Sequence, residues 1–463
     1  MTTSRIAFAD LTSHGVHPKV GAANRLDPYW DGLWASGALA SWVSAESAAR
    51  QERAGLARVP APLAMDPQEA WEKFVGGYGW RRKLEVLGVL GSWRTLSAEQ
   101  LAAFVGAPSI AGRSRLMDAA FACGLVDHGI FTSGLVRTHL SSRAKLFRPS
   151  GTDVFAKRVA PMLTYPELTL VTGGRKFKTG GQYDRHNLLT SELALRVAEF
   201  CDVGTVLGET YSTVDLLLGS GIGKPPIVKR NQSADATIVR ADGMRVAVEI
   251  TASVASLKEK VHRWAERMST DSFARTGLNI LFVGAPPPDR PHGRSQDEFL
   301  RILRKTIRRV LAEYPGVPGA NLADRFWVAM WEDWFPAPGM VTESFLTLRA
   351  HRLSPGARAP WREAGILDEF EVPFEPHDPA AMTAVLSGAA TVASPPVWLR
   401  RRYETVPLHR YAMAKGGFDS VPVPHPQKPP AGAGQATPAA RTSVARASAR
   451  LSNAPSPDEG AIS

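Results

Sequence analysis

Two acidic residues, Asp235 and Glu249, stand in short apolar segments within the stretch SADATIVRADGMRVAVEIT, which runs from Ser233 to Thr251. These segments are typical of two β-strands joined by a glycine turn. A carboxylate in a half-buried strand is costly to desolvate unless a cation meets it, and two neighbouring carboxylates also repel each other. A bound divalent metal ion would offset both the desolvation cost and the repulsion between the carboxylates, so a metal site is the first chemistry to consider.

The length of the turn decides whether the two carboxylates meet. A two-residue loop at 242–243 would place Asp235 and Glu249 on opposite faces of the hairpin. A three-residue loop at 241–243, with Gly243 in the left-handed conformation, places Asp235 opposite Glu249 and collects the apolar side chains on the other face. A slip of one residue would destroy that apolar face, so we predict the three-residue loop and paired carboxylates.

The same residues resemble the motif of restriction-endonuclease-like nucleases, in which Asp is followed, after a spacer, by Glu-x-Lys on the adjacent strand. Here the motif reads Asp235…Glu249-Ile250-Thr251. In active nucleases of this class the carboxylates hold Mg²⁺, which activates water, and the lysine stabilises negative charge on the phosphate. The resemblance therefore implies Mg²⁺ as the cofactor, Asp235 and Glu249 as catalytic and metal-binding residues, and a metal-dependent endonuclease as the activity.

The departure from this motif is Thr251, which stands where the lysine is expected and cannot supply a positive charge. Lys258 and Lys260, in the following predicted helix, are the candidates to replace it, although both positions also suit a solvated helix flank. The resemblance further implies that Glu192, on the helix before the sheet, is a third acidic ligand of the metal.

Helices alternate with strands around these residues, and this order predicts a layered α/β sheet. His186 and His262, which flank the hairpin in the sequence, are interpreted as structural or surface residues. The predicted elements are a helix at 187–200, an extended segment at 204–209, the hairpin at 235–251, a helix at 254–268, a strand at 278–285, a helix at 297–312 and a strand at 325–331.

The segment 81–150 carries ten basic and four acidic residues, a net charge of +6. It is predicted to form three helices and a β-hairpin, with Ser97 and Gln100 as the capping box of the second helix. Gly106 ends that helix, and Ser109 caps the third. This is the element order of a winged helix-turn-helix, whose third helix enters the major groove of DNA.

Winged helices also serve as protein-docking modules, but the basic charge of this segment favours DNA. On the third helix Arg115 points away from the apolar side and is free to meet DNA. The candidates for contact with double-stranded DNA are Arg113, Ser114, Arg115, Arg137, Arg143 and Lys145.

The composition agrees with a polyanionic partner. The 463 residues include 55 Lys and Arg against 44 Asp and Glu, a net charge of +11, and the pI is about 9.8. Cys123 and Cys201 are the two cysteines, too few for a disulfide framework or a cysteine zinc cluster, which fits a reducing compartment. No signal peptide or membrane-spanning run is visible, so we expect a cytoplasmic protein without membrane contact.

Three stretches of the sequence together resemble the replication-relaxation family of actinobacterial plasmids, phages and other mobile elements. They are RLMDAAFACGLVDHG, RHNLLTSEL, and ADATIVRADGMRVAVEIT with the lysine-rich helix after it. The resemblance covers roughly residues 81–331. Members of the family commonly keep the Asp and Glu but often lack the lysine, which agrees with Thr251. The resemblance implies double-stranded DNA and replication or conjugation proteins as partners.

We therefore predict an α+β and α/β multidomain protein with a winged helix-turn-helix, a restriction-endonuclease-like domain and a tail rich in Pro, Ala, Ser and Gly. The predicted units are an N-terminal helical extension at 1–80, the winged helix-turn-helix at 81–150, the nuclease-like α/β domain at 151–340, a C-terminal extension packed on the core at 341–420 and a disordered tail at 421–463.

The first function expected from the sequence is that of a DNA-binding protein of a mobile element, acting in replication or relaxation, whose nuclease-like domain lacks the full catalytic set. Two alternatives stay open. An active Mg²⁺-dependent endonuclease or nickase requires an ammonium group near Asp235 and Glu249. A winged-helix transcriptional repressor requires two recognition helices at half-site spacing and no metal affinity.

Overall fold

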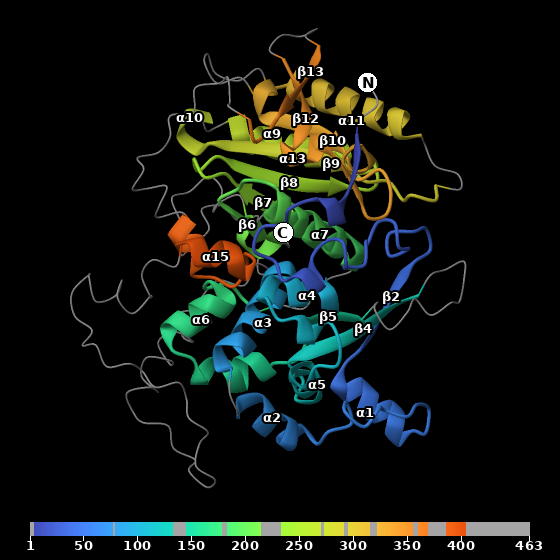
Figure 1. Ribbon diagram of the computed structural model, residues 1–463, viewed down its shortest axis with the longest axis vertical. Coiled ribbons are helices and arrows are strands. Elements are labelled where there is room, and N and C mark those ends of the chain that lie inside the picture. Colours follow the sequence, from blue (N-terminus) through green and yellow to red (C-terminus); the bar gives the residue numbers. More distant parts are fainter. Residues whose placement is uncertain are drawn as a thin grey trace, which may run out of the picture.

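A seven-stranded mixed sheet contains the predicted carboxylate hairpin (Figure 1). The strand order is β13-β12-β10-β9-β8-β7-β6, with β8, β9 and β10 parallel and the other neighbours antiparallel. The alternation of helices and strands predicted between 187 and 331 is confirmed. The strands are β6 (Thr205–Gly208), β7 (Ala236–Val239), β8 (Arg245–Thr251), β9 (Leu278–Gly284), β10 (Phe326–Met330), β12 (Arg349–Leu353) and β13 (Trp361–Gly365).

The computed structural model describes residues 4–76, 79–132, 145–177, 183–213, 233–269, 273–290, 295–314, 322–354, 360–368 and 386–403. The predicted tail at 421–463 lies outside these ranges. None of the helices formed within them is long and apolar enough to cross a lipid bilayer.

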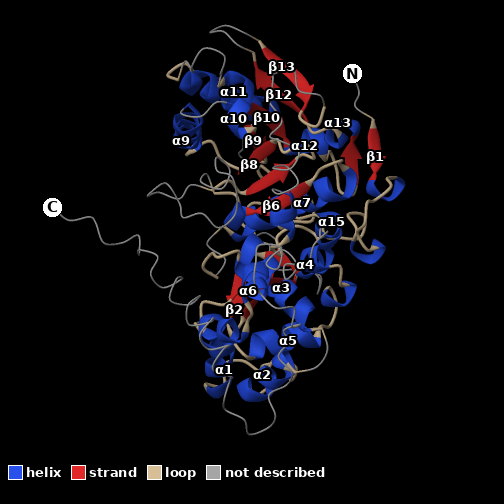
Figure 2. Ribbon diagram, turned by 90° about the vertical axis from the view of Figure 1, so that its left-hand side faces the viewer, coloured by secondary structure: helices blue, strands red, loops and turns tan. Residues whose placement is uncertain are grey.

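Helices cover both faces of the large sheet. Helix α7 (Asp184–Phe200) packs on the face to which β8 turns Val246, Val248 and Ile250. On the opposite face lie α9 (Leu257–Ser269) and α11 (Gln296–Leu311), which pack against each other and bury their own apolar side chains against the strands. Figures 1 and 2 show α9 and α11 together at one end of the molecule, with α7 on the side of the sheet that faces the helices at Trp80–Trp93 and Ala98–Val105.

The three helices predicted in the segment 81–150 are present, and the first strand of the hairpin predicted at 126–138 is formed at Val126–Thr132; its partner strand lies beyond the predicted bounds, at Lys145–Pro149. The capping box of Ser97 and Gln100 is present, and Gly106 ends its helix with φ of 66°, as predicted. The elements are α3 (Trp80–Trp93), β3 (Leu96–Ser97), α4 (Ala98–Val105), α5 (Arg115–Ala122), β4 (Val126–Thr132) and β5 (Lys145–Pro149). Strand β5 pairs with both β4 and β3.

The third of these helices is shorter than predicted. A 3-10 turn occupies Pro108–Ile110, and α5 begins only at Arg115. Ser114 rather than Ser109 is its cap, because the Ser114 hydroxyl accepts a hydrogen bond from the Met117 amide at 3.4 Å. The helix packs against α2 (Pro67–Val75), so part of its surface is covered.

The predicted N-terminal helical extension also contains strands. Strand β2 (Leu39–Val43) pairs with β4 at the edge of a four-stranded sheet, and β1 (Arg5–Ala7) pairs with β11 (Met340–Thr342). In the C-terminal extension, β12 and β13 continue the large sheet. The other α-helices of the described ranges are α1 (Ala45–Arg53), α6 (Tyr165–Thr172), α10 (Phe273–Thr276), α12 (Trp331–Trp334), α13 (Glu343–Leu346) and α15 (Val397–Tyr403).

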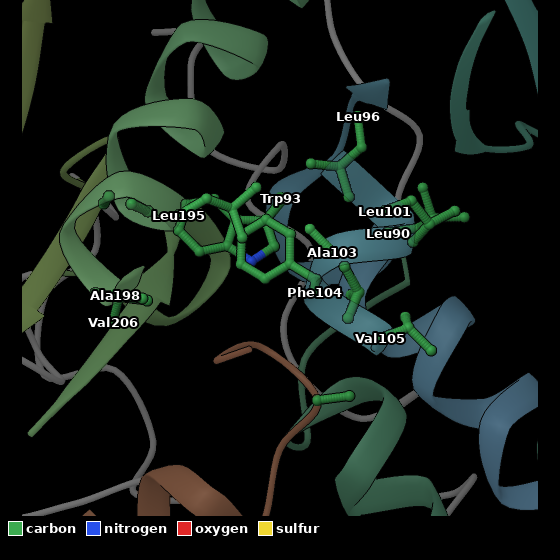
Figure 3. Close-up of a cluster of buried hydrophobic side chains, with 14 of the residues drawn as sticks. Leu90, Trp93, Leu96, Leu101, Ala103, Phe104, Val105, Leu195, Ala198 and Val206 are labelled. Carbon is green, nitrogen blue, oxygen red and sulfur yellow. The ribbon is translucent and has the colours of Figure 1, made fainter. Parts of the chain in front are cut away.

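One apolar core runs through both the helical unit and the sheet. Its buried side chains include Trp93 of α3 and Phe104 of α4, whose ring centroids are 4.9 Å apart, together with Leu195 of α7 and Val206 of β6 (Figure 3). Helix α4 packs on α7, and α3 packs on β6. The DNA-contacting unit predicted from the sequence and the carboxylate hairpin are therefore joined by continuous packing.

Candidate functional site

The hairpin brings Asp235 and Glu249 together in the predicted register. Gly243 adopts φ of 84°, and the Arg240 amide donates a hydrogen bond to the Met244 carbonyl at 2.9 Å, so the loop has three residues. The ladder between β7 and β8 then places Asp235 across from Glu249. This part of the prediction is confirmed.

Glu249 meets a cation from the helix that follows it. The Lys260 ammonium lies 2.7 Å from Oε2 of Glu249, and the Trp264 indole N–H donates to Oε1 at 2.8 Å. Lys260 and Trp264 are four residues apart, so they lie on the same side of α9. Lys258 is exposed and forms no ion pair with Glu249, so of the two candidate lysines the structure brings Lys260 to the carboxylates.

Asp235 forms an ion pair with a histidine. His186, in the first turn of α7, has Nε2 2.6 Å from Oδ2 of Asp235, and the Ile250 amide donates to the same oxygen at 2.7 Å. His186 was interpreted as a structural or surface residue rather than a ligand, and its contact with Asp235 is a structural ion pair within the carboxylate site. His262 lies elsewhere, with Nε2 3.7 Å from the Glu313 carboxylate.

A second ion pair adjoins this cluster. Glu209, directly after β6, accepts a hydrogen bond from the Ser233 hydroxyl at 3.4 Å and lies 3.1 Å from the Arg94 guanidinium. Burial raises the pKa of Glu209, Arg94 opposes this, and the nearby Asp235 charge raises the pKa further. Arg94, at the end of α3, has φ of 64°, an uncommon conformation for a residue with a side chain.

Sequence reasoning missed both Arg94 and Glu209. The available signal was the position of Glu209 at the end of a strand that neighbours the hairpin. No comparable signal marks Arg94, because its approach depends on how α3 packs against the sheet.

The two carboxylates differ in how readily they ionise. Burial and the neighbouring Asp235 charge raise the pKa of Glu249, and Lys260 only partly offsets this. Burial also disfavours the charged form of Asp235, but His186 and Lys260 reverse the effect and its pKa is lowered. Burial lowers the pKa of His186, yet Asp235 outweighs burial and the net pKa is raised. Asp235 is therefore the more persistent anion, and the two cations compensate the pair.

The donor chemistry fits Mg²⁺, because this ion is commonly held by one or two carboxylates together with water and phosphate oxygens. Thr251 is on the same face of β8 as Glu249, and its buried hydroxyl has no hydrogen-bond partner in the part of the chain that is described. Both oxygens of Glu249 already accept hydrogen bonds, so a metal ion there would take the place of Lys260 or Trp264. No three His, Cys, Asp or Glu residues in the described ranges are arranged to hold a metal ion.

Glu192 is not part of this site, and its prediction as a third ligand is wrong. Its side chain is fully buried, with Oε1 2.9 Å from the Arg25 guanidinium and 3.1 Å from that of Arg196. Gln100 donates a hydrogen bond to Oε2 at 3.2 Å. Burial opposes ionisation of Glu192, but the two arginines lower its pKa, so it is a stable anion inside the core.

The second predicted site is basic and surrounds the start of α5. Arg113 and Arg115 are exposed, whereas Ser114 is half-buried and serves as the helix cap. Lys145, at the start of β5, has Nζ 3.5 Å from the Gly112 carbonyl, which brings it to the same end of the helix. Four of the six predicted contacts therefore lie at one end of α5, and three of them are cationic.

Asp118, in the first turn of α5, lies near these charges. Burial raises its pKa, and Lys145 and Arg113 both act in the opposite direction. The other two predicted contacts, Arg137 and Arg143, lie outside the described residues.

No protein-family model, no curated protein and no solved structure matches this chain.

Proposed function

We propose that this protein binds double-stranded DNA through the three-helix and hairpin unit, as a winged helix-turn-helix does. The observation that carries the proposal is the group of Arg113, Arg115 and Lys145 around the exposed start of α5. Their positive charges suit the phosphate backbone, and the first residues of a recognition helix are those that reach base edges. Because α2 covers part of α5, the contact is made by the start of the helix rather than its whole length.

The role we assign to this binding is replication or relaxation of a mobile DNA element, in keeping with the family resemblance of the sequence. In this role the carboxylate pair belongs to a restriction-endonuclease-like domain that supports DNA binding. Lys260 and His186 then balance Glu249 and Asp235.

The test is duplex binding by the full chain, measured by fluorescence anisotropy over a range of salt concentrations. Arg115→Ala should weaken binding and reduce the slope of log affinity against log salt by about 0.9, the value for one lost phosphate contact. Arg401→Ala, an exposed arginine on α15, is the matched control. Equal effects of the two substitutions would remove α5 from the interface.

A second function, metal-dependent cleavage of DNA, is favoured by one observation, the 2.7 Å approach of Lys260 to Glu249. The ammonium group that Thr251 cannot provide comes from α9 instead. Asp235 and Glu249 would hold Mg²⁺, which when bound supplies an activated water and a Lewis acid for the phosphate. Lys260 would then stabilise the negative charge that develops on the phosphate oxygens.

This alternative is tested by incubating supercoiled plasmid with the purified protein and Mg²⁺ or Mn²⁺. Lys258→Ala is a matched control for Lys260→Ala, since both lysines are on α9. Nicking that is lost in Lys260→Ala and Glu249→Ala but kept in Lys258→Ala supports a nuclease. Binding without nicking by the unaltered protein rules the nuclease out and leaves DNA binding.

A further inference from the structure

A basic groove is lined by residues of α11 and by Trp361 of β13. Figure 1 shows these two elements at the opposite end of the molecule from α5. The volume of the groove is about 660 Å³. Five of its lining side chains are cationic and one is a carboxylate, an excess of four positive charges. The charged residues are Arg301, Arg304, Lys305, Arg308, Arg309 and Asp297.

The cations follow the helical repeat. Arg301, Arg304 and Arg308 are spaced by three and four residues, and Lys305 is four residues from Arg301, so the four form one stripe along α11. The opposite side of the same helix is buried in the core under the sheet. Arg301 lies 4.0 Å from Glu298, so its charge is partly engaged, whereas Lys305 and Arg309 extend into solvent.

An aromatic ring forms the inner part of the groove. The Arg304 guanidinium lies over Trp361 of β13, 5.8 Å from the ring centroid, and the half-buried Trp361 also packs on the apolar core. Nε of Arg304 is buried without a hydrogen-bond acceptor among the described residues. Burial lowers the pKa of Arg304, and Asp333 and Glu363 only partly offset this, so an added anion would be favourable there.

We propose that this groove binds single-stranded nucleic acid, with the phosphates against the α11 stripe and a base against Trp361 and Arg304. Strand-binding grooves combine these two features, because cations follow the backbone while aromatic rings and guanidinium planes stack with unpaired bases. A duplex offers phosphates but keeps its bases stacked inside, so it would leave the aromatic part of the groove unused. The groove is separate from the duplex interface proposed at α5.

The experiment compares the affinity of the full chain for a short oligothymidylate and for an abasic strand of the same length. Stacking of one base is worth about 1–3 kcal/mol, so the oligothymidylate should bind from about five-fold to more than a hundred-fold more tightly. The variant Lys305→Glu with Arg309→Glu should weaken strand binding at least ten-fold. It should also lower the salt slope by about 1.4, the value for two lost single-strand contacts.

The control variant is Arg401→Glu with Arg402→Glu, which makes the same change in net charge at exposed positions on α15. It should leave strand affinity within about two-fold, because charges beyond a Debye length are screened. Equal losses in the two variants would overturn the proposal, and so would equal affinity for the abasic strand. Arg115→Ala separates this groove from the duplex interface, since it should weaken duplex binding and leave oligothymidylate binding unchanged.

Discussion

The ion pair between Lys260 and Glu249 permits the sharpest prediction. Replacing Lys260 by Met keeps most of the side-chain volume but leaves the Glu249 carboxylate beside Asp235 without its cation. Removing one partner of a fully buried ion pair costs about 3–5 kcal/mol. The Lys260 side chain is 24% exposed and that of Glu249 is 4% exposed, so solvent reduces the loss. We expect a decrease in the free energy of unfolding of about 2–3 kcal/mol at pH 7.

The loss should depend on pH in a definite direction. The pKa of Glu249 is already raised in the folded protein, and removal of Lys260 raises it further. The folded state therefore gains stability by taking up a proton, and the cost of Lys260→Met should shrink as the pH falls toward the ordinary carboxyl pKa. Urea denaturation at several pH values measures this.

Two further variants make the prediction refutable. Lys258→Met, on the exposed side of the same helix, should change the free energy of unfolding by no more than about 0.5 kcal/mol. Adding Glu249→Gln to Lys260→Met removes the unpaired charge and should recover most of the loss, because both groups are then neutral. A Lys260→Met variant as stable as Lys258→Met, or strictly additive effects in the double variant, would refute this account of the site.

Other predictions concern the surrounding structure. The pKa of His186 is raised in the folded protein, so its contribution to stability is complete below the unfolded-state pKa of about 6.5 and is lost as the pH rises through the folded-state pKa. His186→Gln should abolish this expected decline. An unchanged profile of stability against pH, measured by urea denaturation, would contradict the contact with Asp235. Gly243→Ala should lower the free energy of unfolding by about 1–2 kcal/mol, since φ is 84° there, and an unchanged unfolding midpoint would contradict the three-residue loop. Glu192→Gln should cost about 3–5 kcal/mol by leaving Arg25 and Arg196 short of negative charge, whereas Glu46→Gln, in an exposed pair, should cost at most about 0.5 kcal/mol; equal losses would refute the buried cluster.

The parts of the site that were predictable from the sequence follow local rules. The hairpin register could be inferred because a single register collects the apolar side chains on one face, and Gly243 allows the turn that this register needs. The capping box of Ser97 and Gln100 was likewise visible as a short pattern. In each case the residues concerned are close in the sequence.

The other parts depend on packing between distant segments. Lys258 and Lys260 both flank the apolar face of α9, so the sequence does not distinguish them. The hydrogen bond from Trp264 to Glu249 orients the helix so that Lys260 reaches the carboxylate. Glu192 was misassigned because its partner Arg25 belongs to an N-terminal segment without any recognisable motif. Arg25 and Glu192 are 167 positions apart, and no local sequence pattern predicts a contact over that separation.

The continuous core has a consequence for any nucleic acid that touches both ends of the molecule. Within the described residues, α4 packs on α7 and α3 packs on β6, so the helical unit and the sheet share one core. The distance from the start of α5 to the groove at α11 is thus set by the protein. A DNA molecule that contacts both sites would have to span this distance by bending or by separating its strands. The protein would then set the distance between the duplex held at α5 and the single strand held at α11.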